Sequence, residues 1–190
     1  EGKGSTWEGG MREPCLVRWP GVVAPGRVES DLACAMDWFV TVLELAGAEI
    51  PSDRLIDGVS LTSLLRGTGR SPRDVMPYFS GKTLTAIRKG PWKLHLMSSE
   101  ANSLNPWRMV PKPHAAPLLF HLEHDPSERF DVAHRNPSVV RELVEEAERL
   151  RRHAETDAPS DSGSPSTWSA AAVRFVRGAA GAGGSVLADR

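Results

Sequence analysis

Apolar residues recur every three or four positions in two stretches of the chain, and this periodicity predicts two amphipathic helices. The first is expected over about residues 31–46, with Ser30 as N-cap and Gly47 as the C-terminal stop. The second begins after Asn136, with Pro137 at the first helical position, where proline is well tolerated. Its apolar stripe consists of Val140, Leu143, Val144, Ala147 and Leu150. Each helix therefore has one face suited to a hydrophobic core.

Shorter apolar runs, bounded by turn-forming residues, predict β-strands in the second half of the chain. The expected strands are residues 75–80, 84–88, 92–97 and 118–122. Lys89-Gly90 separates the second strand from the third and has the composition of a hairpin turn. Because a hairpin joins antiparallel neighbours, these segments predict an antiparallel sheet.

Three further segments have patterns that predict a polar face, an irregular loop and a buried strand. Within residues 92–97, apolar residues alternate with Lys93 and His95, which are therefore expected on the polar face of the strand. Residues 98–116 are rich in Pro, Ser and Asn and are expected to form a long irregular loop. The apolar run 15–19 is expected to be a buried strand, because turn-forming residues follow it.

Composition places the chain among globular proteins. It has 190 residues, of which 40% are hydrophobic and 25% charged, which suffices for one compact domain or parts of two. A net charge of -1 gives no reason to expect nucleic acid or an anionic membrane as a partner. No apolar run reaches the roughly 20 residues of a membrane helix. Residues 156–190 consist mainly of small and polar residues and are expected to be disordered.

The N-terminal segment combines a lysine with several glycines. Gly2 and Gly4 flank Lys3, so the backbone can pass close to a ligand and Lys3 can present its ammonium group to an anion. An ordinary surface turn with a solvated lysine explains the same residues, and both interpretations stay open. A nucleotide-binding phosphate loop is excluded, because its lysine is followed directly by Ser or Thr and here Gly4 intervenes.

The segment from Lys3 to Pro14 carries a longer pattern: lysine, glycine, two hydroxyl residues, an aromatic residue, Glu-Gly-Gly, and then Arg and Pro. This pattern resembles the sulfatase family, in particular its arylsulfatase A and N-acetylgalactosamine-6-sulfatase branch. Residues 51–61, 117–122 and 125–130 are most similar to the galactosamine-6-sulfatase side of that branch. The resemblance extends over about residues 1–153.

The resemblance implies an α/β chain with the alkaline-phosphatase-like sulfatase fold. Residues 1–72 would be the C-terminal end of the large α/β domain. Residues 73–155 would be a small C-terminal α+β subdomain, with an antiparallel sheet and a packed helix, and residues 156–190 a low-complexity tail. The chain is therefore expected to be a C-terminal fragment that does not include a signal peptide.

The same resemblance implies site residues. Lys3 matches the sulfate-contacting lysine of the family, which assigns it a catalytic and substrate-binding role. His114 precedes the predicted strand 118–122 and is similar in position to a histidine near the substrate in the arylsulfatase A branch, so it is expected at the rim of the cleft. Glu8 and Arg12 are assigned to loop architecture, because an acid and a base four residues apart form an ordinary ion pair.

The resemblance further implies two cofactors, a calcium ion and a formylglycine made from the cysteine of a Cys-x-Pro-Ser-Arg-type motif. Neither Cys15 nor Cys34 begins such a motif. The residues for both groups are therefore expected upstream of this chain, and no metal ligand is assigned within it. His121 and His124 lack Cys or Glu partners at zinc-ligand spacing and are expected to be structural, as is Asp37.

Two functions remain open at this point. The first is the C-terminal portion of a sulfatase that acts on a sulfated small molecule or glycan, with a lysosomal, secreted or periplasmic location implied by the resemblance and a homo-oligomer left open. The second is a non-catalytic binding module derived from a degenerate sulfatase. A phosphatase of the same superfamily ranks third, because the Lys3 pattern is sulfatase-like. Under the first interpretation the isolated chain is expected to be inactive.

Overall fold

The computed structural model describes residues 2–101 and 109–156 of the chain. The chain divides into two compact units. Unit 1 contains Glu1–Glu13 together with Pro77–Arg190, and unit 2 contains Pro14–Met76. The N-terminal residues thus fold with the second half of the chain, although the whole of unit 2 separates them in sequence.

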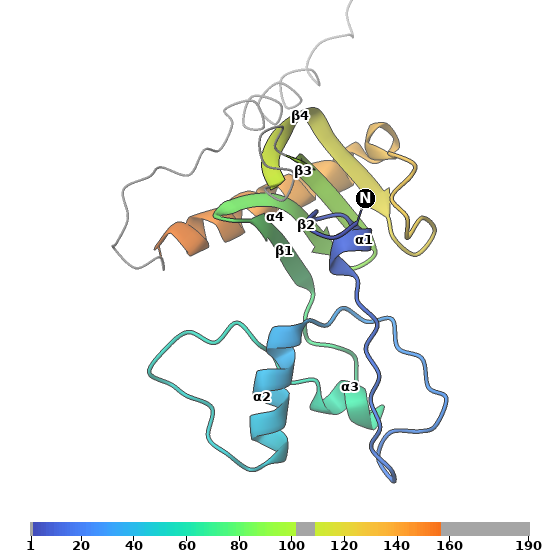
Figure 1. Ribbon diagram of the computed structural model, residues 1–190, viewed down its shortest axis with the longest axis vertical. Helices are drawn as coiled ribbons and strands as arrows, with labels where there is room; N and C mark the ends of the chain where they lie inside the picture. The colour runs from blue at the N-terminus through green and yellow to red at the C-terminus, as the bar shows by residue number, and fades with distance from the viewer. Residues whose placement is uncertain (1, 102–108, 157–190) are drawn as a thin grey trace, which may run out of the picture. The chain divides into compact units, whose positions relative to one another are not determined.

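Unit 1 is built on a four-stranded sheet with the strand order β1-β2-β3-β4 (Figure 1). The strands are β1 (Val75–Ser80), β2 (Thr83–Lys89), β3 (Trp92–Ala101) and β4 (Met109–His121). β3 pairs antiparallel with both β2 and β4. The predicted antiparallel sheet is therefore confirmed, and its first strand has the predicted bounds.

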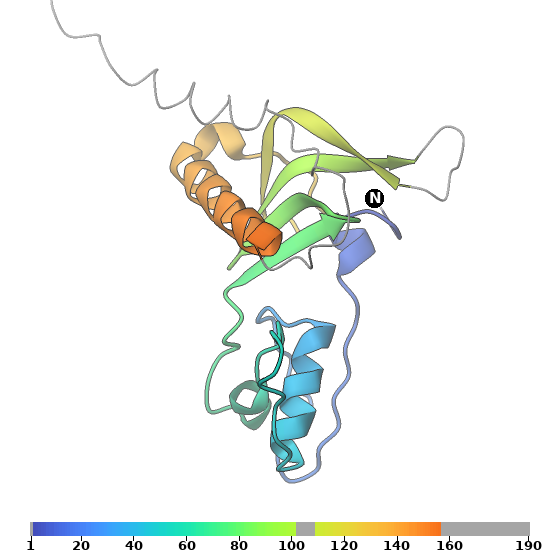
Figure 2. The ribbon, with the colours of Figure 1, turned by 90° about the vertical axis from the view of Figure 1, so that its left-hand side faces the viewer.

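Different parts of the chain cover the two faces of this sheet. Helix α4 (Pro137–Thr156) lies across one face and the short helix α1 (Glu8–Met11) lies against the other, as Figures 1 and 2 both show. The register partners Ile87, Leu94 and Leu119 are fully buried. The predicted stripe of α4 is buried at Val140, Leu143, Val144 and Ala147. These residues form the apolar core of unit 1.

The predicted polar face of β3 is not exposed to solvent. The side chains of Lys93 and His95 are fully buried, so the expectation from their alternation with apolar residues is wrong. The physical reason is that the N-terminal segment covers this face and supplies Glu8 as a charged partner for Lys93. A central strand with both faces covered does not need to alternate between apolar and polar residues.

β4 is much longer than the predicted strand 118–122. The described residues of the predicted irregular loop, 98–101 and 109–116, all belong to β3 or β4, so that prediction is wrong for them. Ser98 pairs with Lys112, and Glu100 pairs with Val110. Prolines are tolerated here because β4 is an edge strand, where a missing N–H need not interrupt the sheet. Residues 102–108 of the predicted loop lie outside the described residues.

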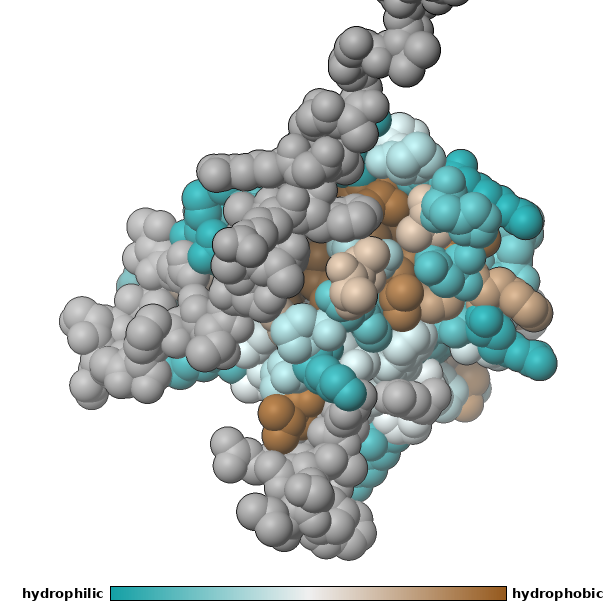
Figure 3. Space-filling view, turned by 90° about the horizontal axis from the view of Figure 1, so that it is seen from above, coloured by the Kyte–Doolittle hydropathy of each residue, from teal (hydrophilic) through white to brown (hydrophobic). Residues whose placement is uncertain are grey.

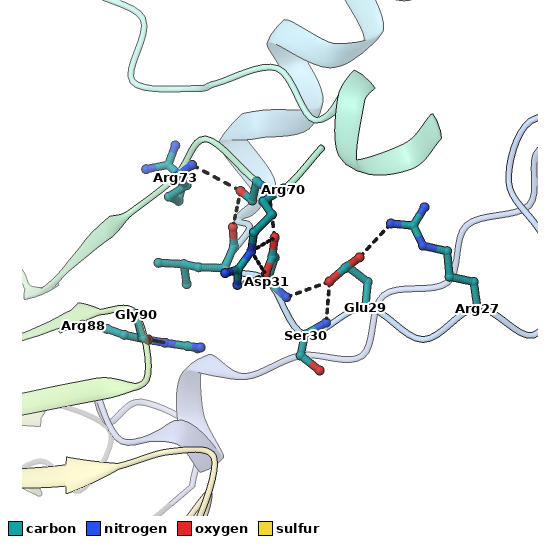
Figure 4. A network of polar contacts seen from close by, with 10 residues as sticks. Arg27, Glu29, Ser30, Asp31, Arg70, Arg73, Arg88 and Gly90 are labelled. Atoms are coloured by element: carbon teal, nitrogen blue, oxygen red, sulfur yellow. Dashed lines mark hydrogen bonds and ion pairs between the residues drawn. The ribbon is translucent and has the colours of Figure 1, made fainter. Parts of the chain in front are cut away.

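Unit 2 contains helices α2 (Ala35–Leu45) and α3 (Thr62–Arg66). Its small core consists of Leu61, Leu64 and Leu65, with Trp19, Val23 and Trp38 packed against them. The predicted start of the first helix near residue 31 is wrong. Asp31 does not enter a helical turn, because its carboxylate accepts hydrogen bonds from the Arg70 guanidinium (2.7 Å) and the Ser71 backbone N–H (2.9 Å) (Figure 4).

Asp37 fixes the true start of α2. Its carboxylate accepts hydrogen bonds from the backbone N–H groups of Cys34 (2.8 Å) and Val59 (3.0 Å) and from Nε of Arg73 (2.9 Å). Burial alone would raise the pKa of Asp37, but these donors outweigh that effect and hold the pKa below its ordinary value. The structural role predicted for Asp37 is confirmed.

Unit 2 also leaves several large apolar side chains exposed. On α2, Met36, Phe39 and Val42 are 46%, 50% and 56% exposed and recur at a spacing of three residues. The run 15–19 forms no strand, and Leu16 within it is 99% exposed, so the predicted buried strand is wrong. A patch of this kind is typical of surfaces that another part of a protein covers.

Hydrophobic and hydrophilic side chains are mixed on the face of the molecule seen in Figure 3. Within the described residues, no helix combines the length and the apolar character required to cross a membrane. The predicted tail, residues 156–190, lies outside the described residues apart from its first residue.

Candidate functional site

Lys3 lies in a tight turn formed by Gly2–Ser5, here called the Lys3 turn. The Ser5 backbone N–H and the Ser5 hydroxyl both donate to the carbonyl oxygen of Gly2, at 3.2 Å and 2.8 Å. Gly4 has φ +90°, the conformation that a type II turn requires at its third position. Lys3 is exposed and forms no hydrogen bond or ion pair with another described residue. Its ammonium group is therefore open to an anion.

The residues directly after the Lys3 turn are fixed on the sheet of unit 1. Thr6 is buried, and its hydroxyl oxygen lies in a hydrogen bond of 3.0 Å with that of Thr85 on β2. The Trp7 ring stacks on His95 of β3, with ring centroids 4.1 Å apart and an interplanar angle of 21°. Its edge also meets Phe120 of β4 at 5.4 Å. Three strands thus hold the segment that carries Lys3.

Helix α1 packs directly against the Lys3 turn at Gly10. A Cβ atom at Gly10 would lie 2.4 Å from the carbonyl oxygen of Ser5 and 2.7 Å from that of Gly2. Both contacts are with backbone atoms, which no side-chain rotation can move away. Only glycine allows this close approach without displacing either the turn or the helix.

Four ionisable side chains form a network in unit 1, here called the buried network: Glu8, Lys93, His95 and Glu128. Nζ of Lys93 lies 2.7 Å from Oε1 of Glu8 and 3.2 Å from Oε1 of Glu128. Nε2 of His95 lies 2.7 Å from the same Glu128 oxygen. The Glu8 backbone N–H donates to the other Glu128 oxygen at 2.5 Å. The network therefore joins α1, β3 and the turn after β4.

Glu128 adopts an unusual backbone conformation in that turn. Its φ is 53°, in the left-handed region that non-glycine residues rarely occupy. Such conformations persist where the surrounding contacts enforce them, and they cluster at functional sites. Here the carboxylate of Glu128 has three partners within the buried network, which supply those contacts.

Burial and charge set the protonation states in the buried network. Burial lowers the pKa of His95 below its ordinary value, although the carboxylate of Glu128 opposes this shift. Burial alone would raise the pKa of Glu128, but the hydrogen bond with His95 and the charge of Lys93 lower it overall. His95 is therefore neutral near pH 7, and Nε2–H donates to the ionised Glu128.

This arrangement predicts that stability depends on pH through His95. As the pH falls below the ordinary histidine value of 6.5, the unfolded chain binds a proton that the folded chain resists, so the free energy of unfolding decreases. The contribution of Glu128 is lost only at lower pH, below its ordinary value of 4.5. Urea unfolding of the full-length protein at pH 7.5 and 5.5 would measure the first effect.

His95→Gln is expected to reduce the difference in unfolding free energy between these two pH values. His134→Gln is the matched control, because His134 is exposed and is expected to leave the difference unchanged. An equal pH dependence in His95→Gln and in the unmodified protein would contradict the assignment of His95 as the titrating group.

His114, the second predicted site residue, lies within β4 and not in a loop ahead of a strand. It is partly buried and lies where the pairing of β4 with β3 shifts register, between the pairs Met97↔Pro113 and His95↔Leu118. His114 and Lys3 both belong to unit 1. Its role at a substrate site stays a prediction.

The described residues of this chain do not fit the two cofactors that the resemblance implies. Within residues 2–101 and 109–156, no group of three or more His, Cys, Asp or Glu is placed to hold a metal ion. Cys15 is exposed, whereas burial raises the pKa of the partly buried Cys34. His121 and His124 stack on each other, with ring centroids 4.3 Å apart. Neither calcium nor formylglycine chemistry can therefore be derived from these residues.

Lys3 could be singled out from the sequence, and its role stays a prediction, but the buried network next to it was missed. Glu8 was expected to pair with Arg12, yet its partner is Lys93, 85 residues away along the chain. Glu128 was not singled out as a site residue. One signal was present: Lys93 and His95 stand between apolar residues of a central strand, where charged side chains require buried partners.

Two family profiles match the chain. The family described as the C-terminal region of aryl-sulfatase matches residues 71–173. The family described as N-sulphoglucosamine sulphohydrolase, C-terminal, matches residues 2–89. Between them, these matches include both the Lys3 turn and the sheet that holds it.

Curated relatives match over most of the chain. Arylsulfatase A of Bos taurus is 37% identical over 161 residues, which cover 78% of this chain and 31% of that protein. N-acetylgalactosamine-6-sulfatase of Canis lupus familiaris is 35% identical over 175 residues, which cover 83% of this chain and 33% of that protein. The chain therefore spans about a third of the length of these relatives.

Solved structures also match most of this chain and about a third of their own length. The PsFucS1 sulfatase from Pseudoalteromonas sp. has a TM-score of 0.74 and 28% identity, covering 84% of this chain and 33% of that one. Ps i-CgsB, solved in complex with k-i-k-neocarrahexaose, has a TM-score of 0.61 and 28% identity, covering 79% and 31%.

Proposed function

The chain belongs to the sulfatase family, whose C-terminal region it contains, and on that premise we propose that it is the C-terminal portion of an enzyme that hydrolyses sulfate esters. The predicted fold class, the alkaline-phosphatase-like sulfatase fold, is confirmed by the likeness to the PsFucS1 sulfatase. Assignment of residues 1–72 to the large domain and residues 73–155 to the small subdomain is part of the proposal.

Lys3 supplies the chemistry that this chain brings to the reaction. When the bond between sulfur and the ester oxygen breaks, negative charge builds on the leaving oxygen while the sulfuryl oxygens keep theirs. An ammonium group held at a fixed position stabilises that charge more than a mobile one, because it needs no reorganisation during the reaction. The observation that carries the proposal is the open ammonium of Lys3 on a turn that the sheet holds in place.

The remaining chemistry is assigned to parts of the enzyme upstream of this chain. A formylglycine hydrate would supply the nucleophile and a calcium ion would bind the sulfate group. The contribution of this chain is to bind and orient the sulfate ester through Lys3, with His114 at the rim of the cleft.

The proposed substrate is a sulfated small molecule or glycan. Two relatives support a sugar: one is named N-acetylgalactosamine-6-sulfatase, and the structure of Ps i-CgsB contains a neocarrahexaose. The proposed location is lysosomal, secreted or periplasmic. Gel filtration of the full-length protein would determine whether it forms a homo-oligomer.

Peptide mapping of the endogenous protein by mass spectrometry tests this proposal against its alternative. A sulfatase is expected to contain a cysteine-derived formylglycine in sequence upstream of Glu1. A mature protein without that residue would favour a non-catalytic binding module built from a degenerate sulfatase. Preferential hydrolysis of phosphate esters would instead favour a phosphatase.

We expect the isolated chain of 190 residues to have no sulfatase activity. Its described residues include no group placed to hold a metal ion, and neither of its cysteines begins a formylglycine motif. The apolar side chains of α2 at Met36, Phe39 and Val42 are also exposed in unit 2. Release of 4-nitrophenol from 4-nitrophenyl sulfate by the purified chain measures this, with the full-length protein as the positive control. Turnover by the isolated chain alone would contradict the expectation.

A further inference from the structure

The buried network contains more charge than the stability of a small sheet requires. The side chains of Lys93, Glu8 and Glu128 are between 0% and 4% exposed. Removing charged groups from water is costly, and well-packed apolar residues often stabilise a protein equally well. Stability alone therefore does not account for the buried network.

Two polar contacts of the buried network reach the segment that carries Lys3, and both are made by Glu8. Glu8 is bound twice: its carboxylate accepts from Lys93 at 2.7 Å, and its backbone N–H donates to Glu128 at 2.5 Å. These bonds fix both the side chain and the backbone of the first residue of α1. Because α1 contacts the Lys3 turn at Gly10, the position of this helix sets the position of the turn.

The aromatic contacts of the segment depend on the same residues. Glu128 orients the His95 ring through the 2.7 Å contact with Nε2. The His95 ring in turn stacks on the ring of Trp7, which lies four residues after Lys3 in the chain. Lys93 lies over the Tyr78 ring of β1, with Nζ 4.4 Å from the ring centroid. The orientation of the His95 ring thus affects the position of Trp7, and with it the backbone that follows the Lys3 turn.

We propose that Lys93, Glu8 and Glu128 are positioning residues for Lys3, through which the C-terminal sheet sets where the ammonium group meets the sulfate ester. This inference rests on the proposed function, in which Lys3 contacts the sulfate group. It goes beyond it by giving the C-terminal sheet a part in the reaction. The three residues touch no substrate; they act through α1 and the Lys3 turn.

The test is a double-mutant cycle in the full-length protein with 4-nitrophenyl sulfate as the substrate. Glu128→Gln keeps the size of the side chain but removes its charge, and we expect it to lower kcat/KM by about 10- to 100-fold, since a displacement near 1 Å has effects of this order. In a protein that already carries Lys3→Ala, the same substitution is expected to cause almost no further loss. Groups that act through one residue give such non-additive losses.

A second variant guards against a simple failure to fold. Lys93→Met combined with Glu8→Gln removes one positive and one negative charge, so the net charge of the buried network is unchanged. We expect the same loss of kcat/KM and the same absence of further loss with Lys3→Ala. Leu143→Ala is the matched control, because Leu143 is buried on α4 and its truncation lowers stability. Helix α4 lies on the face of the sheet opposite α1 (Figure 2). This control should leave kcat/KM unchanged at temperatures where the protein is folded.

The outcomes distinguish a failure of the proposed function from a failure of the positioning role. If the unmodified protein does not hydrolyse the sulfate ester, the proposed function fails. If it does and Lys3→Ala is impaired, but both network variants keep full kcat/KM, the positioning role is wrong. Losses that multiply with that of Lys3→Ala would also overturn it, because they would indicate a general structural effect.

Discussion

Replacing Lys3 with alanine is expected to lower kcat/KM for a sulfate ester by about 10²- to 10³-fold in the full-length protein, the usual effect of removing one preorganised charge-stabilising group. Lys3 lies in a turn closed by two hydrogen bonds to Gly2 and is open to an anion. Under the proposed function, its removal deletes a charge that stabilises the transition state, while leaving the turn intact. Initial rates with 4-nitrophenyl sulfate over a range of concentrations would measure the loss.

Lys82→Ala is the matched control for this experiment. Lys82 is another exposed lysine of unit 1, in the turn between β1 and β2, and it has no proposed contact with substrate. Its variant is expected to keep the kcat/KM of the unmodified protein. Full activity in Lys3→Ala, or an equal loss in Lys82→Ala, would contradict a specific role for Lys3.

Replacing Gly10 with alanine is expected to lower kcat/KM by about 10²-fold, since a misplacement near 1 Å has effects of this size. The new Cβ would lie 2.4 Å from the Ser5 carbonyl oxygen and 2.7 Å from the Gly2 carbonyl oxygen, so the Lys3 turn must move. Within a helix, alanine is otherwise preferred over glycine. The loss would therefore reflect displacement of the turn and not poor helix propensity.

Gly2→Ala provides the comparison, because a Cβ at Gly2 meets no heavy atom within 4 Å. It changes a glycine of the same turn without forcing the backbone to move and is expected to keep kcat/KM near the original value. Thermal unfolding of both variants would separate a loss of folded protein from a loss of turnover. Equal kcat/KM in Gly10→Ala and the unmodified protein would mean that the close approach of α1 does not position Lys3.

Several elements of unit 1 could be predicted from local sequence. Helix α4 begins at Pro137 as expected, because the cap, the proline and the apolar stripe all point to the same start. The first strand has its predicted bounds, and the hairpin around Lys89-Gly90 forms as expected. These features depend on interactions between residues close in sequence, which periodicity and turn composition report directly.

The start of α2 could not be predicted from local sequence because distant residues decide it. Ser30 and Asp31 form a reasonable local start for a helix, yet the carboxylate of Asp31 binds Arg70, 39 residues away. The helix begins instead at Ala35, where Asp37 accepts from Cys34 and from Arg73. Tertiary hydrogen bonds thus overrode a weak local preference.

The candidate site also combines a local feature, which the sequence indicates, with long-range contacts, which it does not. The Lys3 turn is a local feature, with a glycine at the position that needs positive φ, and the sequence alone points to it. The buried network joins Glu8 to Glu128, which are 120 residues apart along the chain. No local pattern could reveal that pairing. It requires knowing that the N-terminal segment covers the second face of β3.

The most direct test of the central claim is sulfate release by the full-length protein. Ion chromatography would measure inorganic sulfate formed from 4-nitrophenyl sulfate, and 4-nitrophenyl phosphate would be assayed in parallel. The account predicts release of sulfate from the first substrate at a rate far above that of phosphate from the second. Absence of sulfate release by a protein in which mass spectrometry detects formylglycine, or faster release of phosphate, would contradict it.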